Sequence, residues 1–126
     1  MMPVPRILLV VPGLLAGLLI PALTSAPKAL PAGTTVGMVG RDFAKDEVKL
    51  HQGQKLTLVN NSSVVHVVGP GVDTHIISPE RGVPMTGFHL MQTNSVYTTG
   101  PWKMTGTFYL TCSVHPGMTL KIVVTP

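Results

Sequence analysis

The sequence predicts an all-β sandwich, and three observations lead to that prediction. Short runs rich in β-branched residues follow one another at roughly 8–12-residue spacing, separated by turns rich in glycine, proline and asparagine. Residues 54–60 alternate polar and apolar side chains, as expected of a strand with one buried face. No stretch of the 126 residues has a convincing helical repeat. The chain is long enough for one domain.

The expected strands follow these turn signals along the chain. In order, they cover residues 34–38, 47–50, 54–60, 64–68, 75–77, 88–91, 95–97, 105–111 and 119–125. Residues 69–71 (Gly-Pro-Gly) are expected to end the strand before them. Residues 72–87 have no sustained period and contain Pro79 and Pro84, so they are expected to be mostly loop. In the last strand, alternate apolar residues predict one core-facing side.

The first residues have the layout of a secretory signal peptide. A positively charged start that includes Arg6 precedes an uncharged apolar run over residues 7–23. That run is at the short end of the roughly 17–25 residues that a membrane span needs. Residues 24–26 are small, as a cleavage site requires, but Pro27 is unfavourable directly after one. Residues 1–26 are therefore expected to be a signal peptide or an uncleaved N-terminal membrane anchor.

Either form of this segment implies an exported protein. Residues 27–33 are expected to be a linker and residues 34–126 the folded domain. That domain would lie in the periplasm, outside the cell, or on the outer face of the cytoplasmic membrane, touching the membrane only through an uncleaved N-terminal segment. It carries seven Lys or Arg and five Asp or Glu without a basic cluster, so nucleic-acid binding is not expected.

Three groups with affinity for soft metals lie within one short segment. Cys112 ends one expected strand, Met118 precedes the next, and His115 lies in the turn between them. Thiolate, imidazole and thioether are ligands that copper prefers, and a His2Cys set with a weak axial Met is the blue-copper arrangement. Pro116 restricts the loop further. A metal ligand role would also account for a lone cysteine in an exported chain.

The fourth ligand must come from elsewhere, and His66 is the best candidate. It follows a strand and a polar turn, which predicts a place at the same end of the sandwich. As rivals we consider His51, His75 and His89 for the imidazole, and Met85, Met91 and Met104 for the thioether.

Each of these residues also has an ordinary explanation. Cys112 alone could be a small buried apolar residue, Met118 a core residue, His115 a surface residue, and His66 a core histidine bonded to the backbone. The combination at this spacing favours a metal site. Zinc fits poorly, because methionine is an unusual zinc ligand. The simplest expectation for Trp102 and Tyr109 is that they are core aromatics.

Two parts of the chain resemble a known family. Residues 106–118, followed by 122–124, resemble the ligand loop and flanking strands of the cupredoxins, specifically the plastocyanin/amicyanin group of type 1 copper proteins. Residues 53–66 resemble that family's first half-motif, with a glycine turn, an amphipathic strand, an asparagine-rich turn and a histidine. The spacing from Cys to Met is like the short amicyanin loop. The resemblance covers most of residues 34–126 but leaves residues 72–87 unmatched.

This resemblance implies a Greek-key β-sandwich that binds one copper ion, cycling between Cu(I) and Cu(II), through His66, Cys112, His115 and Met118. One departure is Val67, where many members have an asparagine whose side chain ties the two ligand loops together. Hydrogen bonds around the ligands orient them and tune the metal. Asn60, Asn61 and Ser63 are the candidates to replace that asparagine.

The implied function is single-electron transfer outside the cytoplasm. Transient protein partners would dock near His115, where Pro116, Gly117 and Pro70 offer small or apolar groups, and the protein would act as a monomer. Copper storage or delivery with the same ligands is the alternative. Enzymatic activity is not expected, because copper oxidases use His-x-His pairs and this chain has none.

Overall fold

The structure is a computed structural model that describes residues 2–5, 13, 17 and 33–126. The expected signal or anchor segment (1–26) and linker (27–33) otherwise lie outside the described residues and stay predictions. Within the part of the chain that is described, no helix is long and apolar enough to span a membrane.

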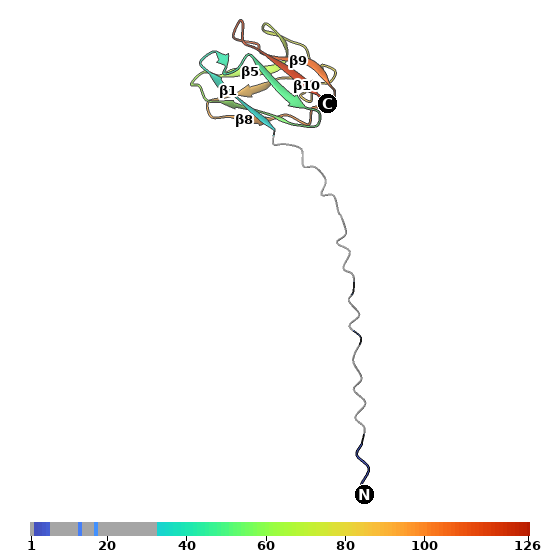
Figure 1. Cartoon of the computed structure of the whole chain (residues 1–126). Coiled ribbons are helices and arrows are strands. Elements are labelled where there is room, and N and C mark those ends of the chain that lie inside the picture. Colours follow the sequence, from blue (N-terminus) through green and yellow to red (C-terminus); the bar gives the residue numbers. More distant parts are fainter. Residues whose placement is uncertain (1, 6–12, 14–16, 18–32) are drawn as a thin grey trace.

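Residues 34–126 fold into two β-sheets that face each other, which confirms the all-β sandwich (Figure 1). The first sheet has the order β2 (Asp42–Phe43), β1 (Thr34–Val39), β4 (Leu56–Asn60), β8 (Val96–Thr98). The second has the order β3 (Glu47–His51), β10 (Thr119–Thr125), β9 (Gly106–Cys112), β5 (His66–Val72), β6 (His75–Ile76), and β7 (His89–Met91) also pairs with β5.

The strand pairing is mixed, and it brings the candidate ligands to one end of the second sheet. β1 pairs with β4, and β10 with β3, in parallel. β9 and β10 form an antiparallel hairpin in which Leu110 lies opposite Leu120. The loop with the Cys-His-Met spacing closes this hairpin.

The core lies between the sheets, where side chains alternate as the strand period requires. In β10, Leu120, Ile122 and Val124 are buried, as expected. Trp102 is fully buried, which confirms its expected place in the core. Tyr109 is 39% exposed, so its assignment to the core is wrong. In β9 the even-numbered residues on either side of Tyr109 face inward, so Tyr109 points outward.

β5 is longer than the sequence predicts. Residues 69–71 were expected to end the strand, but β5 continues to Val72. Gly69 pairs with Thr111 and Pro70 with Leu110, so the segment is held by β9. Gly69 also allows a close approach, because a Cβ there would lie 2.8 Å from the carbonyl oxygen of Gly87. The expectation for residues 72–87, a loop with one short strand, is confirmed by β6.

Candidate metal centre

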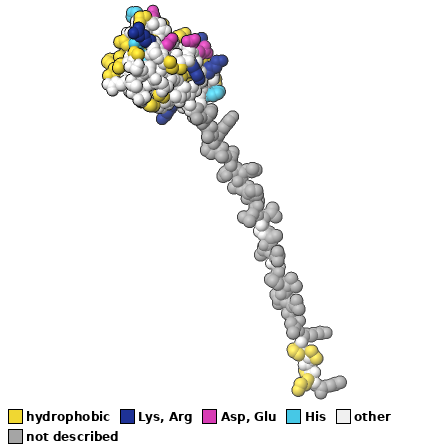
Figure 2. All heavy atoms as spheres, turned by 90° about the vertical axis from the view of Figure 1, so that its left-hand side faces the viewer, with side chains coloured by type: hydrophobic (Ala, Val, Ile, Leu, Met, Phe, Trp, Pro, Cys, Tyr) yellow, Lys and Arg dark blue, Asp and Glu magenta, His cyan; other side chains and the backbone are white. Residues whose placement is uncertain are grey.

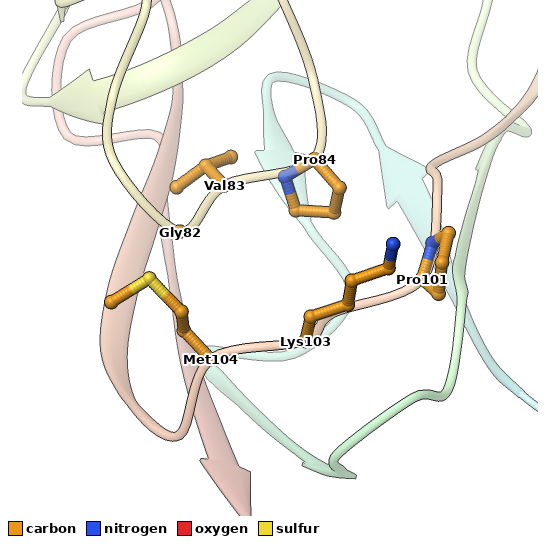
Figure 3. Close-up of a pocket in the computed structure, with 6 residues that line it drawn as sticks. All are labelled: Gly82, Val83, Pro84, Pro101, Lys103 and Met104. Carbon is orange, nitrogen blue, oxygen red and sulfur yellow. The ribbon is translucent and has the colours of Figure 1, made fainter.

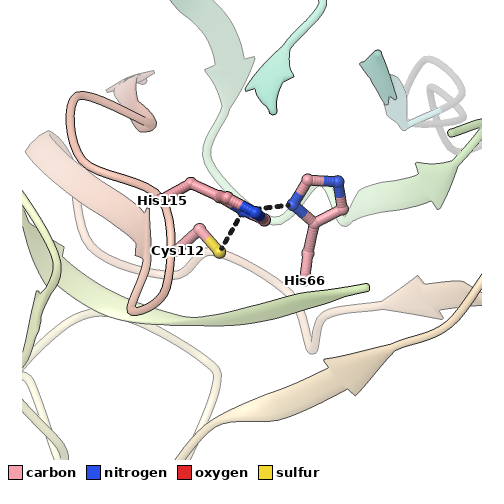
Figure 4. Close-up of side chains that lie close together, drawn as sticks. All are labelled: His66, Cys112 and His115. Atoms are coloured by element: carbon pink, nitrogen blue, oxygen red, sulfur yellow. Dashed lines mark hydrogen bonds between the residues drawn. The ribbon is translucent and has the colours of Figure 1, made fainter. Parts of the chain in front are cut away.

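The structure brings together three side chains that are far apart in the sequence. The Nδ1 atoms of His66 and His115 are 3.1 Å apart, and the sulfur of Cys112 is 3.3 Å from Nδ1 of His115. The potential ligand atoms of these three residues all lie within 4.8 Å of one another. Figure 4 shows both rings and the thiol directed toward one point.

The register of two neighbouring strands accounts for this convergence. His66 is the first residue of β5 and Cys112 the last residue of β9. β5 and β9 are antiparallel, with Val68 opposite Cys112. Because side chains two residues apart point to the same face, His66 and Cys112 both face the interior at the same end of the sandwich. Both side chains are fully buried.

Backbone hydrogen bonds close the loop that carries His115 and Met118. The Cys112 N–H donates to the carbonyl of Met118 (3.1 Å), and the Met118 N–H donates to the carbonyl of His115 (3.2 Å). Gly117 has a φ of 80°, a left-handed conformation that favours glycine. Met118 is fully buried directly before β10. The four predicted residues therefore gather at one end of the domain.

The backbone of Val67 joins the two segments that carry these residues. Its N–H points at the sulfur of Cys112 (3.5 Å), and its carbonyl accepts a hydrogen bond from the N–H of Ser113 (2.9 Å). An asparagine side chain at this position is therefore not needed to connect the two segments. Of the replacements considered, Asn60 instead binds the carbonyls of Val64 and Met91.

A serine that the sequence analysis did not single out orients the ring of His66. The hydroxyl of Ser62 lies 3.1 Å from Nε2 of His66 and 2.7 Å from Oδ1 of Asn60. Since the amide oxygen of Asn60 can only accept, the hydroxyl donates to it and accepts from Nε2–H. This arrangement leaves Nδ1 of His66 unprotonated, with its lone pair on the side of His115. The signal available in the sequence was the polar turn four residues before His66.

Burial, followed by the nearby His115, lowers the pKa of His66 below its usual value of 6.5, although a backbone hydrogen bond with Gly40 opposes the shift. Burial favours the uncharged ring because a charge loses its hydration there. The neutral imidazole is the form that binds metals. The fold thus keeps His66 in its ligating form at neutral pH.

The rival histidines lie elsewhere. Nδ1 of His51 is 3.3 Å from the carbonyl oxygen of Pro126, and Nδ1 of His75 is 2.8 Å from that of Asp73. The His89 ring stacks on Tyr97, with centroids 3.7 Å apart. Among the described residues, no second group of three or more His, Cys, Asp or Glu side chains is placed to hold a metal.

The rival methionines belong to the core or to the surface. Met85 and Met91 are buried core residues, and Met91 lies opposite His66 in the β5–β7 pair. Met104 is 39% exposed and lines an open hollow that shares no residue with the His–Cys–His cluster (Figure 3). Thiol, two imidazoles and an adjacent buried thioether together fit the ligand preferences of copper.

Comparison with known proteins supports the fold. No family model and no curated protein sequence matches the chain. A reduced amicyanin variant matches with a TM-score of 0.58 and 21% identity, over 78% of this chain and 87% of that one. Amicyanin from Paracoccus versutus gives 0.57 and 19%, over 78% and 86%. A purple cupredoxin from Nitrosopumilus maritimus gives 0.60 and 14%, over 73% and 99%. The chain therefore has the cupredoxin fold, as the resemblance predicted.

Proposed function

We propose that this chain is a type 1 copper protein that carries single electrons between redox partners. The observation that carries the proposal is the buried cluster of His66, Cys112 and His115, assembled beside Met118 on a cupredoxin fold. These four residues would hold one copper ion, which supplies one-electron chemistry between Cu(I) and Cu(II) when bound. Nothing in this role requires a bond to be made or broken in a substrate, so we propose that the protein is not an enzyme.

The surroundings of the cluster favour electron transfer because they resist rearrangement. The loop between Cys112 and Met118 is short, contains Pro116, and is closed by its own backbone hydrogen bonds. Ser62 restrains the ring of His66 from the other side. Ligands held this firmly change position little between oxidation states, which lowers the cost of each electron transfer.

We propose that partners dock over His115. His115 is half-buried. Its chain neighbour Val114 is 54% exposed, and Val65, the chain neighbour of His66, is 45% exposed. The His66 and His115 ring centroids are only 4.8 Å apart, so the two segments that carry these valines meet at the same site. A small apolar rim of this kind fits a transient partner, with an interface below roughly 1,200 Å². We propose that the protein acts as a monomer.

Two further parts of the proposal come from charge and from the N-terminal segment. Basic and acidic side chains are interspersed on the face in Figure 2, which supports a protein rather than a nucleic-acid partner. The charge and hydropathy of residues 1–26 support export, as a signal peptide or as an anchor on the outer face of the cytoplasmic membrane.

The test is the absorption and electron-spin-resonance spectrum of the purified protein after addition of Cu(II). We expect an intense visible band from the Cys112 thiolate and Cu(II). Cys112→Ser should abolish the band, and a band that persisted would refute Cys112 as a ligand. His66→Gly should alter the spectrum, and added imidazole should restore it. A protein that binds Cu(I) tightly but gives no such band with Cu(II) would instead favour copper storage or delivery.

A further inference from the structure

A tight turn outside the metal centre has an unusual backbone. β5 and β6 are joined by Asp73 and Thr74, with Val72 opposite His75. The φ angles of Asp73 and Thr74 are 44° and 66°. Two-residue hairpin turns of this hand favour asparagine, aspartate and glycine, and a β-branched residue with positive φ is uncommon. The contacts around the turn must therefore hold Thr74 in this conformation.

Those contacts lead to the strands on either side of the metal-binding loop. The N–H of Asp73 donates to the hydroxyl of Thr119 (3.1 Å), and the N–H of Thr74 donates to the hydroxyl of Thr111 (3.1 Å). Thr111 directly precedes Cys112, and Thr119 directly follows Met118. The turn thus lies across both ends of the loop.

Two further hydrogen bonds continue into the loop itself. The carboxylate of Asp73 accepts the N–H of Gly117 (3.2 Å). The hydroxyl of Thr111 donates to the carbonyl of Met118 (2.8 Å), which also accepts the N–H of Cys112. Gly117 is exposed, so without Asp73 its N–H would bind only water. The turn therefore makes hydrogen bonds to Thr111 and Thr119, which flank the loop, and to Gly117 within it.

From this geometry we infer that the β5–β6 turn is a brace for the metal-binding loop, with Asp73 as a positioning residue for His115 and Met118. The consequence of the brace, a fixed geometry of the metal ligands, rests on the proposed function. The contacts themselves belong to the chain whether or not copper is bound. The turn lies within residues 72–87, which the sequence resemblance leaves unmatched.

The test uses two variants of the full chain that both suit the turn. Asp73→Gly removes the acceptor without adding backbone strain, because glycine tolerates positive φ. Asp73→Asn removes the charge but keeps an oxygen that can accept the Gly117 N–H. The control is Thr98→Val, which removes an exposed hydrogen bond to Thr57 on the other sheet.

The first measurement is amide hydrogen exchange at Gly117 in the metal-free protein. Asp73→Gly should speed exchange roughly three- to tenfold, the range expected for loss of one hydrogen bond, whereas Asp73→Asn and Thr98→Val should leave it unchanged. If Asp73→Asn exchanges as fast as Asp73→Gly, the effect is one of charge and the brace is refuted. Equal rates in all variants would also refute it.

The second measurement is made with Cu(II) and separates this inference from the proposed function. Asp73→Gly should shift the thiolate–Cu(II) band and the reduction potential from the wild-type values, and Asp73→Asn should retain the band, because the charge that it removes acts on the potential. An unshifted band and potential in Asp73→Gly would overturn the positioning role. If the wild type forms no such band, the proposed function fails, and the exchange rates at Gly117 still decide whether Asp73 holds the loop.

Discussion

The ring of His66 is held between a polar partner on one side and the other residues of the candidate metal centre on the other. Its Nε2 atom faces the hydroxyl of Ser62, and its Nδ1 atom faces the ring of His115. Both Ser62 and His66 are buried, so neither side chain can exchange its partner for water. The hydrogen bond at one nitrogen consequently determines which nitrogen is available to a metal.

Loss of the Ser62 hydroxyl should weaken copper binding. We expect Ser62→Ala to lower copper affinity about 10–100-fold, the usual range for removing a partner of a metal-binding histidine. Competition with a chelator of known affinity measures this change. Ser63→Ala is the matched control, because that neighbouring side chain is exposed. Equal affinities in both variants would mean that Ser62 does not orient the ring.

The low pKa of His66 makes the metal-free protein sensitive to acid. Because burial holds the pKa of His66 below 6.5 in the folded state, the unfolded chain binds more protons as the pH falls through 6.5. The free energy of unfolding should therefore keep its highest value above pH 6.5 and decrease as the pH falls below it. Urea unfolding at pH 7.5, 6.5 and 5.5 measures the decrease, and His66→Gln should reduce it. An equal decrease in that variant would assign it to another group.

The thioether of Met118 should tune the metal without being essential for binding it. Met118→Leu keeps an apolar side chain of similar size in a fully buried position. We expect this variant to bind copper and to show a raised reduction potential, since the axial ligand sets the potential in such sites. Voltammetry measures it, with Met104→Leu as the control. An unchanged potential would assign the axial position to another residue.

At the scale of the elements, Asn60 connects the strands around the site. Its Nδ2 donates to the carbonyls of Val64 and Met91, both at 2.8 Å, and its Oδ1 accepts from the N–H and hydroxyl of Ser62. The last residue of β4 is thereby joined to the end of β7 and to the turn before His66. Asn60 is fully buried, so these bonds replace hydration that the side chain has lost.

Removal of this side chain should destabilise the whole domain. Asn60→Ala removes the side-chain donor to the Met91 carbonyl and the acceptor of the Ser62 N–H, both in buried hydrogen bonds, and each group left unsatisfied costs about 1–3 kcal/mol. We therefore expect the free energy of unfolding to fall by about 2–4 kcal/mol, as measured by urea denaturation. The exposed neighbour provides the control, and Asn61→Ala should change stability by less than about 0.5 kcal/mol. Similar losses in both variants would contradict this role for Asn60.

On the scale of the whole molecule, the candidate metal centre and the largest core side chain are anchored at different ends of β4. Asn60 ends β4 beside the site, whereas Leu56 begins β4 and bonds to the hydroxyl of Thr99, which also accepts the indole N–H of Trp102 (2.9 Å). The backbone of Trp102 is bonded to Gln54 and Gly53 in the turn before β4. Core stability and metal binding should therefore be separable.

A change at Trp102 tests this separation. Trp102→Phe leaves a smaller ring and removes the hydrogen bond to Thr99, so we expect a loss of about 1–3 kcal/mol in the free energy of unfolding. The thiolate–Cu(II) spectrum of the folded variant should match that of the wild type. A spectrum altered as strongly as by Ser62→Ala would show that the two ends of the sandwich are coupled.

Much of the fold could be predicted from local patterns. Alternation in residues 54–60 and 119–125 predicted strands whose buried positions the structure confirms. The prediction failed at residues 69–71, because pairing with β9 outweighs the local preference of glycine and proline for a turn. It also failed at Tyr109, which shares its face of β9 with Thr107 and Thr111 and points away from the core that Leu110 enters.

The chain by itself determined the parts of the site that depend on short spacing. Cys112, His115 and Met118 are close in sequence, so any hairpin that includes them delivers all three to one loop. Only the tertiary structure decided the roles of Ser62, the Val67 backbone and Asp73. Ser62 reaches His66 across the folded turn before β5. The Val67 backbone and Asp73 act through the position of β5 relative to its neighbours, and a shift of one residue would turn every side chain of that strand to the opposite face.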